Sequence, residues 1–400
     1  MDFKIDKKAE KILHTLNEAG YEAYIVGGCV RDMILKRVPG DWDITTSAKP
    51  EEIKNCFTHT YDTGIKHGTI TVLMGNDSYE TTTYRIEGEY TDCRHPDEVQ
   101  FTRDIHEDLL RRDFTMNSIA YHPDEGFIDP FGGVKDIDRG VIRGVGCPDE
   151  RFKEDALRML RAVRFAAQLG FEIEDETWQA LKANAELIQK ISAERIKEEL
   201  QKLIMSDRPE KLTFLAESGL MKYISPELDK IISEKSTELA KELSRAEKEQ
   251  TLRWAIFLQG LGENGSAKLM KKLKFDTKTL KAASKVIGEN ENYQLTDGYE
   301  IKKTVEKLGD EIYEILLKFN IACGKENSER AEEEYRKIRG NDECIFMKQL
   351  KINGGILKKL GITDGKLIGE ALKASLDEAH KDNNNNNSEY LEKFVLDRFS

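Results

Sequence analysis

Two aspartates with one residue between them, Asp41 and Asp43, have the spacing that most directly suggests chemistry. In an extended strand alternate side chains lie on one face, so we expect the two carboxylates to lie side by side. A divalent metal ion is the usual partner that offsets their repulsion. Phosphoryl transfer with two Mg²⁺ ions usually places a third carboxylate nearby, and Glu80, on a neighbouring β-rich run, is the candidate. Exposed strand residues without a catalytic role are the alternative for all three.

A pair of glycines, Gly27 and Gly28, lies shortly before these aspartates, between an apolar run at 23–26 and a short predicted helix that carries Arg31. Glycines ahead of a helix let backbone N–H groups approach a phosphate. The guanidinium of Arg31 can bind a triphosphate in a bidentate manner, and an exposed ion pair with Asp32 is the alternative. Together with the aspartates, this stretch predicts a site for a metal ion and a nucleoside triphosphate.

A second cluster of charge, Arg111, Arg112 and Asp113, is followed by the apolar residues Phe114 and Met116. The segment is therefore predicted to be partly buried. Arginine with buried neighbours is normally paired, and a ribose or a phosphate group would be one such partner. The alternative is the solvated start of a helix.

A long helix is predicted from Pro148 to about Leu169, where Gly170 ends it. Four charged residues recur every three positions along it and form one polar stripe: Asp155, Arg158, Arg161 and Arg164. A paired Asp and Arg can read the Watson–Crick edge of a base, because the carboxylate accepts from an exocyclic amine and the guanidinium donates to the ring nitrogen beside it. Such a pair would accept cytosine and adenine and reject uracil and guanine. The alternative is an ordinary surface pair worth a few tenths of a kcal/mol.

The elements that must position these residues change in character along the chain. The first part mixes helical patterns with β-rich runs, including a predicted hairpin over 67–85 and a short strand near 142–145, and a long polar loop is predicted at 86–106. All eight prolines lie at or before Pro226, and the last 174 residues show apolar residues at helical spacing. We expect an α+β fold: an N-terminal domain with a mixed β-sheet and helices, then an all-α remainder.

Composition excludes several classes of protein. No apolar run approaches the ~18–20 residues of a spanning helix, and the N-terminus lacks the order of a signal peptide, so we expect no membrane association. Six scattered cysteines without a Cys-x-x-Cys pair indicate reduced thiols in a cytoplasmic protein. The net charge of −12 argues against a protein that coats DNA, and any nucleic-acid contact would need a local basic surface. The five asparagines from Asn383 to Asn387 predict a flexible loop.

Five ordered blocks of the sequence resemble those of one family, the class II CCA-adding tRNA nucleotidyltransferases of the polymerase-β-like superfamily. The blocks are Gly27-Gly28-x-Val30-Arg31-Asp32, Gly40-Asp41-x-Asp43-Ile44-x-Thr46-Ser47, Arg111-Arg112-Asp113-Phe114-Thr115-x-Asn117, Phe127-x-Asp129-Pro130-Phe131-Gly132-Gly133 and Glu154-Asp155-x-x-Arg158. The resemblance covers residues 20–205 well, and the helical remainder matches in character only.

The resemblance implies a nucleotidyltransferase head at 1–147, a nucleotide-selecting neck at 148–208, a body at 209–275 and a tRNA-binding tail at 276–400. It implies an enzyme that adds C, C and A to the 3′ end of tRNA from CTP and ATP without a nucleic-acid template, and that releases pyrophosphate. Asp41 and Asp43 would hold two Mg²⁺ ions. The nucleotide-binding residues would be Gly27, Gly28, Arg31, Arg112, Asp113, Asn117, Asp155, Arg158, Arg161 and Arg164. Body and tail would bind the tRNA acceptor arm through phosphate contacts.

Other activities use the same blocks, so they stay open as alternatives. Within the family these are CC-only, A-only and poly(A) addition. Part of the loop at 86–106 is missing in relatives that add only CC, and its full length here favours CCA addition. The short chain without a basic tail disfavours poly(A) addition. A non-catalytic nucleotide- or tRNA-binding protein and a transferase acting on a small molecule are the remaining alternatives.

Overall fold

The computed structural model describes residues 5–88, 99–291 and 297–399. The chain divides into two compact units, residues 1–240 and 241–400. The predicted boundaries at 147, 208 and 275 would subdivide these units and stay predictions. No helix in the described ranges is long and apolar enough to cross a membrane.

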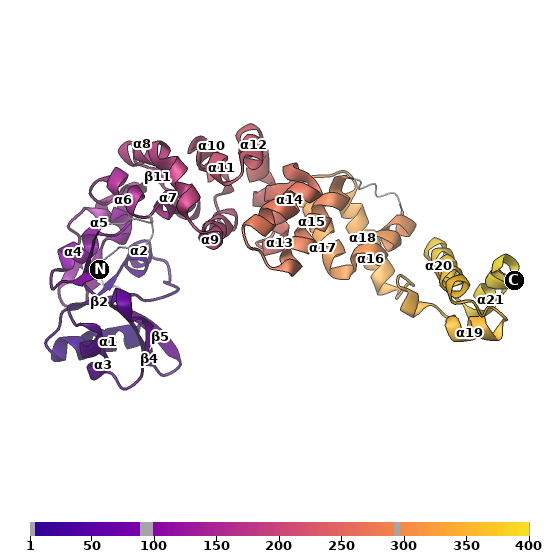
Figure 1. Ribbon diagram of the computed structural model, residues 1–400, viewed down its shortest axis with the longest axis horizontal. Helices are drawn as coiled ribbons and strands as arrows, with labels where there is room; N and C mark the ends of the chain where they lie inside the picture. The colour runs from indigo at the N-terminus through magenta and orange to yellow at the C-terminus, as the bar shows by residue number, and fades with distance from the viewer. Residues whose placement is uncertain (1–4, 89–98, 292–296, 400) are drawn as a thin grey trace. The chain divides into compact units, whose positions relative to one another are not determined.

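The first unit contains a seven-stranded mixed sheet in the order β3-β4-β5-β2-β1-β8-β9. Strands β2 and β5 are parallel, and the other neighbouring pairs are antiparallel. The strands are β1 (Ala23–Val26), β2 (Ile44–Thr46), β3 (Thr60–Gly64), β4 (Thr69–Met74), β5 (Asp77–Thr83), β8 (Ala120–His122) and β9 (Gly126–Ile128). In Figure 1 the labelled strands lie in the indigo to magenta part of the chain, which confirms the predicted α+β class.

Short helices connect and flank these strands. They are α1 (Lys7–Glu18), α2 (Gly28–Ile34), α3 (Pro50–Cys56), α4 (Ile105–Leu110) and α5 (Gly133–Arg139), with 3-10 turns η1 (Ile65–His67) and η2 (Thr115–Asn117). The side chain of Asp6 caps α1 by accepting from the backbone N–H groups of Lys8 and Ala9. Pro50 occupies the first turn of α3, where its missing N–H costs nothing.

Strand β1 organises the sheet because its four residues are all buried and its end meets two other segments. Since β2 and β8 both run antiparallel to β1, the start of each lies beside the end of β1. The backbone N–H of Val26 donates to the carbonyl of Asp43 (3.0 Å), and that of Gly27 donates to the carbonyl of Ile119 (3.2 Å). Segments far apart in sequence are thereby brought to one edge.

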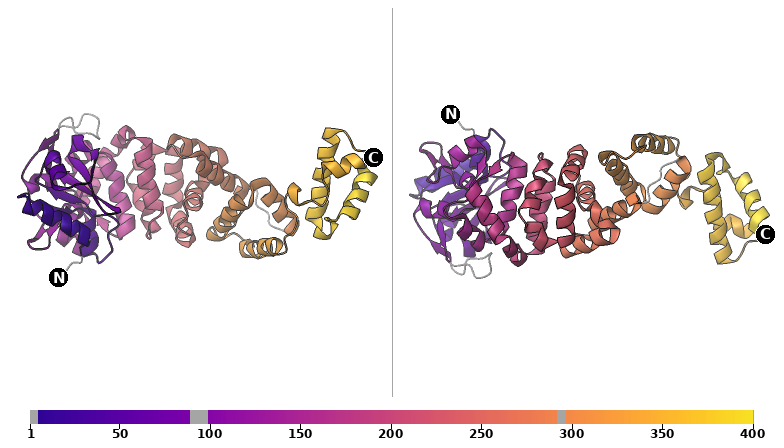
Figure 2. Two further views of the ribbon diagram at one scale, coloured as in Figure 1. Left: turned by 90° about the horizontal axis from the view of Figure 1, so that it is seen from below. Right: turned by 90° about the horizontal axis from the view of Figure 1, so that it is seen from above.

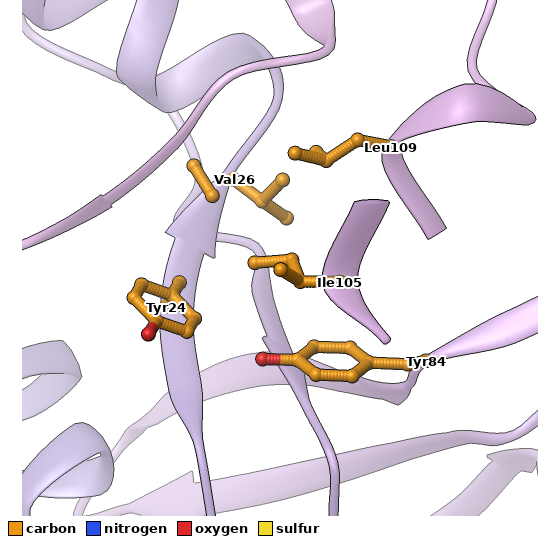
Figure 3. Close-up of a cluster of buried hydrophobic side chains, with 6 residues drawn as sticks. Tyr24, Val26, Tyr84, Ile105 and Leu109 are labelled. Atoms are coloured by element: carbon orange, nitrogen blue, oxygen red, sulfur yellow. The ribbon is translucent and has the colours of Figure 1, made fainter. Parts of the chain in front are cut away.

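A small hydrophobic cluster fixes helix α4 against β1. Figure 3 shows Tyr24 and Val26 of β1 pointing toward Ile105 and Leu109 of α4, with the ring of Tyr84 beneath them. Each of these side chains is at most 7% exposed. Their burial holds the C-terminal end of α4, and hence the segment that follows it, close to the end of β1.

The predicted loop at 86–106 is partly structured. Its two flanks pair as a two-stranded sheet of β6 (Arg85–Glu87) and β7 (Val99–Phe101), and α4 begins at its end. The part at 89–98 lies outside the described residues. The predicted strand near 142–145 is shorter and lies outside the main sheet: β10 (Val141–Ile142) pairs in parallel with β11 (Glu172–Ile173).

The predicted continuous helix from Pro148 to Leu169 is wrong, because the chain breaks at Asp155. One helix, α6 (Pro148–Glu154), ends there with Asp155 in an extended conformation (φ −136°, ψ 100°), and α7 (Leu157–Leu169) begins two residues later. The Asp155 carboxylate accepts from the backbone N–H of Leu157 (3.1 Å) and so satisfies part of the new helix start. Gly170, at φ 75°, ends α7 as predicted.

The rest of the chain is helical, as predicted, and Figure 2 shows this from two further sides. The first unit continues with α8 (Asp175–Asn184), η3 (Ala185–Lys190), α9 (Ala193–Ile204), η4 (Pro209–Lys211), α10 (Leu212–Glu217), α11 (Leu220–Ile224) and α12 (Pro226–Arg245), which passes residue 240. The second unit contains α13 (Gln250–Leu258), η5 (Gln259–Leu261), α14 (Gly262–Lys272), α15 (Thr277–Glu291), α16 (Gly298–Leu308), α17 (Asp310–Ala322), α18 (Ser328–Gly340), η6 (Met347–Gln349), α19 (Gly354–Lys359), α20 (Gly365–Lys381), η7 (Asn383–Asn385) and α21 (Ser388–Phe399).

The asparagine tract is ordered by hydrogen bonds, contrary to the predicted flexible loop. The side-chain carbonyl of Asn383 accepts from the backbone N–H of Cys344 (2.9 Å), and that of Asn386 accepts from the N–H of Lys351 (3.0 Å). Asn387 caps helix α21 by accepting from the N–H of Tyr390 (2.9 Å). The tract therefore fastens α20 and α21 to the segment before α19.

Candidate active site

A polar pocket of about 470 Å³ lies in the first unit. Seven arginines and four aspartates line it, together with two glycines, an asparagine and a phenylalanine: Gly27, Gly28, Arg31, Asp41, Asp43, Arg111, Arg112, Asp113, Asn117, Asp155, Arg158, Arg161, Arg164, Phe165 and Arg195. Every residue that the sequence analysis predicts to bind a metal ion or a nucleotide lines this pocket, and the predicted third carboxylate, Glu80, does not. The pocket thus carries an excess of positive charge in a chain of net charge −12, as a site for a polyanion requires.

Backbone conformation requires glycine at the turn, and a larger residue there would also displace the end of the Arg112 side chain. Gly27 has φ +83°, and a Cβ atom there would lie 2.9 Å from Nη1 of Arg112. Arg31, in α2, is only 9% exposed, so the alternative of a solvated pair is wrong. Its guanidinium donates to both Asp32 (2.8 and 2.9 Å) and the side-chain carbonyl of Asn117 (2.8 Å).

The two aspartates lie just before strand β2, which begins at Ile44, and not within a strand as predicted. Burial, and then the neighbouring charge of Asp41, raise the pKa of Asp43 to about 6, although Arg112 acts in the opposite direction. The ion pairs of the described pocket residues involve Asp113 and Asp155 but neither Asp41 nor Asp43. An exposed and a half-buried carboxylate that repel each other in this way suit a hard divalent cation such as Mg²⁺.

Glu80 lies close to this pair without lining the pocket. The parallel register pairs Ile44 with Thr81, so one residue earlier Asp43 lies beside Glu80. The charge of Glu80 contributes to the raised pKa of Asp43. Among the described residues no three acidic, His or Cys side chains come together as a metal-binding group, so a catalytic role of Glu80 stays a prediction.

Asp113 connects the sheet-bearing part of the unit to helix α7. One carboxylate oxygen accepts from Nε and Nη2 of Arg161 (2.8 and 2.6 Å), and the other accepts from the side-chain amide of Asn117 (3.1 Å). Burial opposes ionisation of Asp113, but the charge of Arg161 and these hydrogen bonds outweigh it and lower the pKa to about 2. The Asn117 amide therefore links Asp113 to Arg31, which it also binds.

The stripe of four charged residues does face the pocket, but its pairing differs from the predicted one. Asp155 forms a bidentate pair with Arg195 of α9 (2.7 and 3.1 Å) and not with Arg158. Arg158 binds Glu154 (2.6 Å) and donates to the backbone carbonyl of Arg111 (2.8 Å). The break after α6 turns the side chain of Asp155 away from the helical register that would place it next to Arg158.

Arg164 is held in the same way from α9. Its Nε lies 2.9 Å from a carboxylate oxygen of Glu199, which is itself only 3% exposed. Arg195 and Glu199 are one turn apart on α9, and Glu199 also lies 4.0 Å from Nη1 of Arg161, so this helix supplies a partner to three of the four stripe residues.

The block Asp129-Pro130-Phe131-Gly132-Gly133 lies outside the pocket and has a structural role. The carboxylate of Asp129 accepts from the backbone N–H groups of Gly133 (2.6 Å) and Val134 (2.9 Å) at the start of α5. A Cβ atom at Gly133 would lie 2.1 Å from the carbonyl oxygen of Thr115. The block thus packs α5 tightly against η2, which carries Asn117.

Sequence reasoning missed three residues of the wall. Arg111 belongs to the charge cluster for which a ribose or phosphate partner is predicted, but it is not among the predicted nucleotide-binding residues. Arg195 is separated from its partner Asp155 by 40 residues, and no spacing rule connects them. Phe165 fits the apolar pattern of α7 and reads as an ordinary core residue; its contact with the arginines depends on their side-chain conformations.

The raised pKa of Asp43 predicts a pH-dependent cost to the metal-free fold. The pKa of this carboxyl is about 6 in the folded protein and 3.8 ordinarily. Its contribution to the free energy of unfolding is therefore fully present below pH 3.8 and is lost as the pH rises through about 6. We expect urea unfolding in EDTA to show the wild type losing on the order of 1–2 kcal/mol relative to Asp43→Asn between about pH 4 and pH 7. Saturating Mg²⁺ should reverse the loss.

The exposed Asp138→Asn variant is the control and should follow the wild type at each pH. Parallel curves for wild type and Asp43→Asn over this range would contradict the account of the carboxylate pair.

Three family models match the chain in succession. The Poly A polymerase head domain matches residues 23–143, the Probable RNA and SrmB-binding site of polymerase A matches residues 170–232, and the tRNA nucleotidyltransferase domain 2 matches residues 246–395.

Individual relatives match over most of their length. The CCA-adding enzyme of Lactiplantibacillus plantarum is 39% identical over 383 residues, which are 92% of this chain and 90% of that protein. The CCA-adding enzyme of Lactobacillus helveticus is 54% identical over 206 residues, about half of either chain. The crystal structure of the Bacillus stearothermophilus CCA-adding enzyme in complex with CTP has a TM-score of 0.82 at 32% identity and covers 98% of this chain and 97% of that one. By this similarity in sequence and structure over nearly the full length, the chain belongs to the CCA-adding enzymes, a family of tRNA nucleotidyltransferases.

Proposed function

We propose that this enzyme adds C, C and A in turn to the 3′ end of tRNA, taking CTP and ATP and releasing pyrophosphate. The observation that carries the proposal is one pocket in which a carboxylate pair, a cluster of arginines and the two residues Asp155 and Arg158 meet. Each supplies one requirement of template-independent nucleotide addition: a metal site, a triphosphate site and a means of choosing the base.

In the proposed reaction the terminal 3′-hydroxyl of tRNA attacks the α-phosphate of the nucleotide, a new P–O bond forms, and the bond to pyrophosphate breaks. Asp41 and Asp43 would hold two Mg²⁺ ions, which when bound favour the ionised hydroxyl and neutralise charge on the phosphates. Arg31 and Arg112 neutralise the triphosphate from fixed positions. Fixed charges that need no reorganisation are the main source of catalysis in such transfers.

Base choice would come from Asp155 and Arg158. Asp155 accepts three hydrogen bonds, from Leu157 and Arg195, whereas two carboxylate oxygens can accept about four. The Asp155 carboxylate can therefore accept one more hydrogen bond, from the exocyclic amine of cytosine or adenine. Arg158 is oriented by Glu154 and by backbone carbonyls, so its donors are fixed before a nucleotide arrives.

The helical second unit would bind the tRNA acceptor arm. Within 348–373 there are six lysines, all exposed, and only two acidic residues. Phosphate contacts need such a local basic surface in an otherwise acidic chain. The Thermotoga maritima CCA-adding enzyme complexed with tRNA has the same fold at 22% identity and a TM-score of 0.67.

Poly(A) addition is the second candidate, because the head matches a Poly A polymerase domain model. The match of the whole chain to CCA-adding relatives favours CCA addition. CC-only addition would be distinguished by the loop at 86–106, whose central part lies outside the described residues.

One incorporation assay tests the function. Three tRNAs that end before C74, C75 or A76 (standard tRNA positions) are incubated separately with labelled CTP and labelled ATP. We expect CTP to extend the first two and ATP only the third, by a single residue. Asp41→Ala should abolish every incorporation while tRNA still binds, because the metal site is lost; incorporation by this variant at the wild-type rate would rule out the site. Repeated addition of A would instead identify poly(A) activity.

A second measurement tests base selection. In Arg158→Ala the donor to the ring nitrogen is lost, so the preference for CTP over UTP should fall roughly ten- to a hundredfold while tRNA affinity is unchanged. The exposed Arg139→Ala variant, outside the pocket, is the control and should keep the wild-type preference. Unchanged selectivity in Arg158→Ala would refute the protein template.

A further inference from the structure

The ring of Phe165 lies in the pocket wall with three guanidinium groups around it. The central carbon of Arg164 is 3.6 Å from the ring centroid, that of Arg31 is 5.1 Å away, and that of Arg161 is 5.4 Å away. All three fall within the roughly 6 Å over which a cation is attracted to an aromatic face.

The ring itself is held in place. Phe165 is 4% exposed and packs edge to face against Phe114, with centroids 6.0 Å apart and planes at 86°. Phe114 directly follows Asp113, so the ring joins helix α7 to the segment that binds Arg161.

Three like charges around one ring need an attraction that their carboxylate partners only partly supply. Arg31 is paired with Asp32 and Arg161 with Asp113, while Glu199 is shared between Arg164 (2.9 Å) and Arg161 (4.0 Å). Burial lowers the pKa of Arg164 to about 10, and the charges of Arg161 and Arg31 act in the same direction against Glu199. Arg31 and Arg161 therefore repel Arg164 where they meet it. Burial also acts against the charge of Arg161, but the charges of Asp113 and Glu199 outweigh it there and raise the pKa.

An aromatic ring can attract the three arginines without the disadvantage that a further carboxylate would have. A carboxylate at this position would attract the arginines, but its charge would also repel a triphosphate. The quadrupole of a phenyl ring attracts cations without adding formal charge. The arginines can thus be gathered in one place and still bind a polyanion.

We propose that Phe165 is a positioning residue whose aromatic face gathers Arg31, Arg161 and Arg164 into a preformed receptor for the triphosphate of the nucleotide. The inference rests on the proposed function of the pocket. Because CTP and ATP share the triphosphate, Phe165 acts equally on both and has no part in choosing the base.

The experiment replaces Phe165 in the full-length enzyme with phenylalanines that carry one, two or three ring fluorines, which weaken the quadrupole stepwise with little change of shape. Pyrophosphate affinity is measured by calorimetry, and KM is measured for CTP and ATP. We expect the Kd for pyrophosphate and both KM values to rise together with each fluorine, by on the order of tenfold at three. Phe165→Leu should bind at least as weakly as the trifluorinated protein.

Two controls separate positioning from structure. The melting temperature should stay constant along the series, and the same substitutions at the buried Phe319 of the second unit should leave all constants unchanged. The preference for CTP over UTP should also stay constant.

A pyrophosphate affinity that does not change with fluorination would overturn the inference, as would a loss of affinity that follows a falling melting temperature. Failure of the unmodified enzyme to incorporate CTP would overturn the proposed function instead, since pyrophosphate binding is measured without turnover.

Discussion

The pair between Asp113 and Arg161 is the interaction on which the pocket depends. Asp113 follows α4 at the edge of the sheet, and Arg161 lies on α7, so the hydrogen bonds from Nε and Nη2 of Arg161 to one oxygen of Asp113 (2.8 and 2.6 Å) close the pocket between them. The same carboxylate orients Asn117, and Asn117 orients Arg31. One acidic side chain thus sets the position of groups on α2, η2 and α7. Its low pKa shows that the charged pair outweighs the cost of burying it.

The wider constraint is electrostatic. Seven arginines in one pocket would repel each other and disorder their long side chains unless each were held. Carboxylates on neighbouring elements hold most of them: Asp32, Asp108, Asp113, Glu154, Asp155 and Glu199. Each of these acids forms an ion pair with an arginine. Among the described residues of the pocket, the carboxylates of Asp41 and Asp43 form no ion pair. The arrangement separates two carboxylates from seven arginines within one cavity, which is the charge distribution that the proposed metal and triphosphate sites need.

Local patterns predicted well which residues meet at the end of the pocket that contains Asp41 and Asp43. The strand at 23–26, the turn at Gly27 and the helix with Arg31 follow from neighbours in sequence, because backbone conformation there is decided by glycine and by burial of β1. The charged stripe of α7 also follows from helical periodicity. Patterns failed where a distant partner decides the outcome. Arg195 binds Asp155 across 40 residues, and the break at Asp155 replaces the one helix that periodicity favours. The asparagine tract is ordered because its side-chain amide oxygens accept hydrogen bonds from backbone N–H groups within 344–351. Composition alone does not indicate these partners.

A double-mutant cycle on Asp113→Asn and Arg161→Gln tests most directly the claim that this pair assembles the pocket. The free energy of CTP binding is measured for the wild type, both single variants and the double variant. The account predicts that each single variant weakens binding substantially, and that the double variant is little worse than either, with a coupling energy of at least about 1 kcal/mol. Effects of the two substitutions that add to within about 0.5 kcal/mol would show that the residues act independently and would contradict the account.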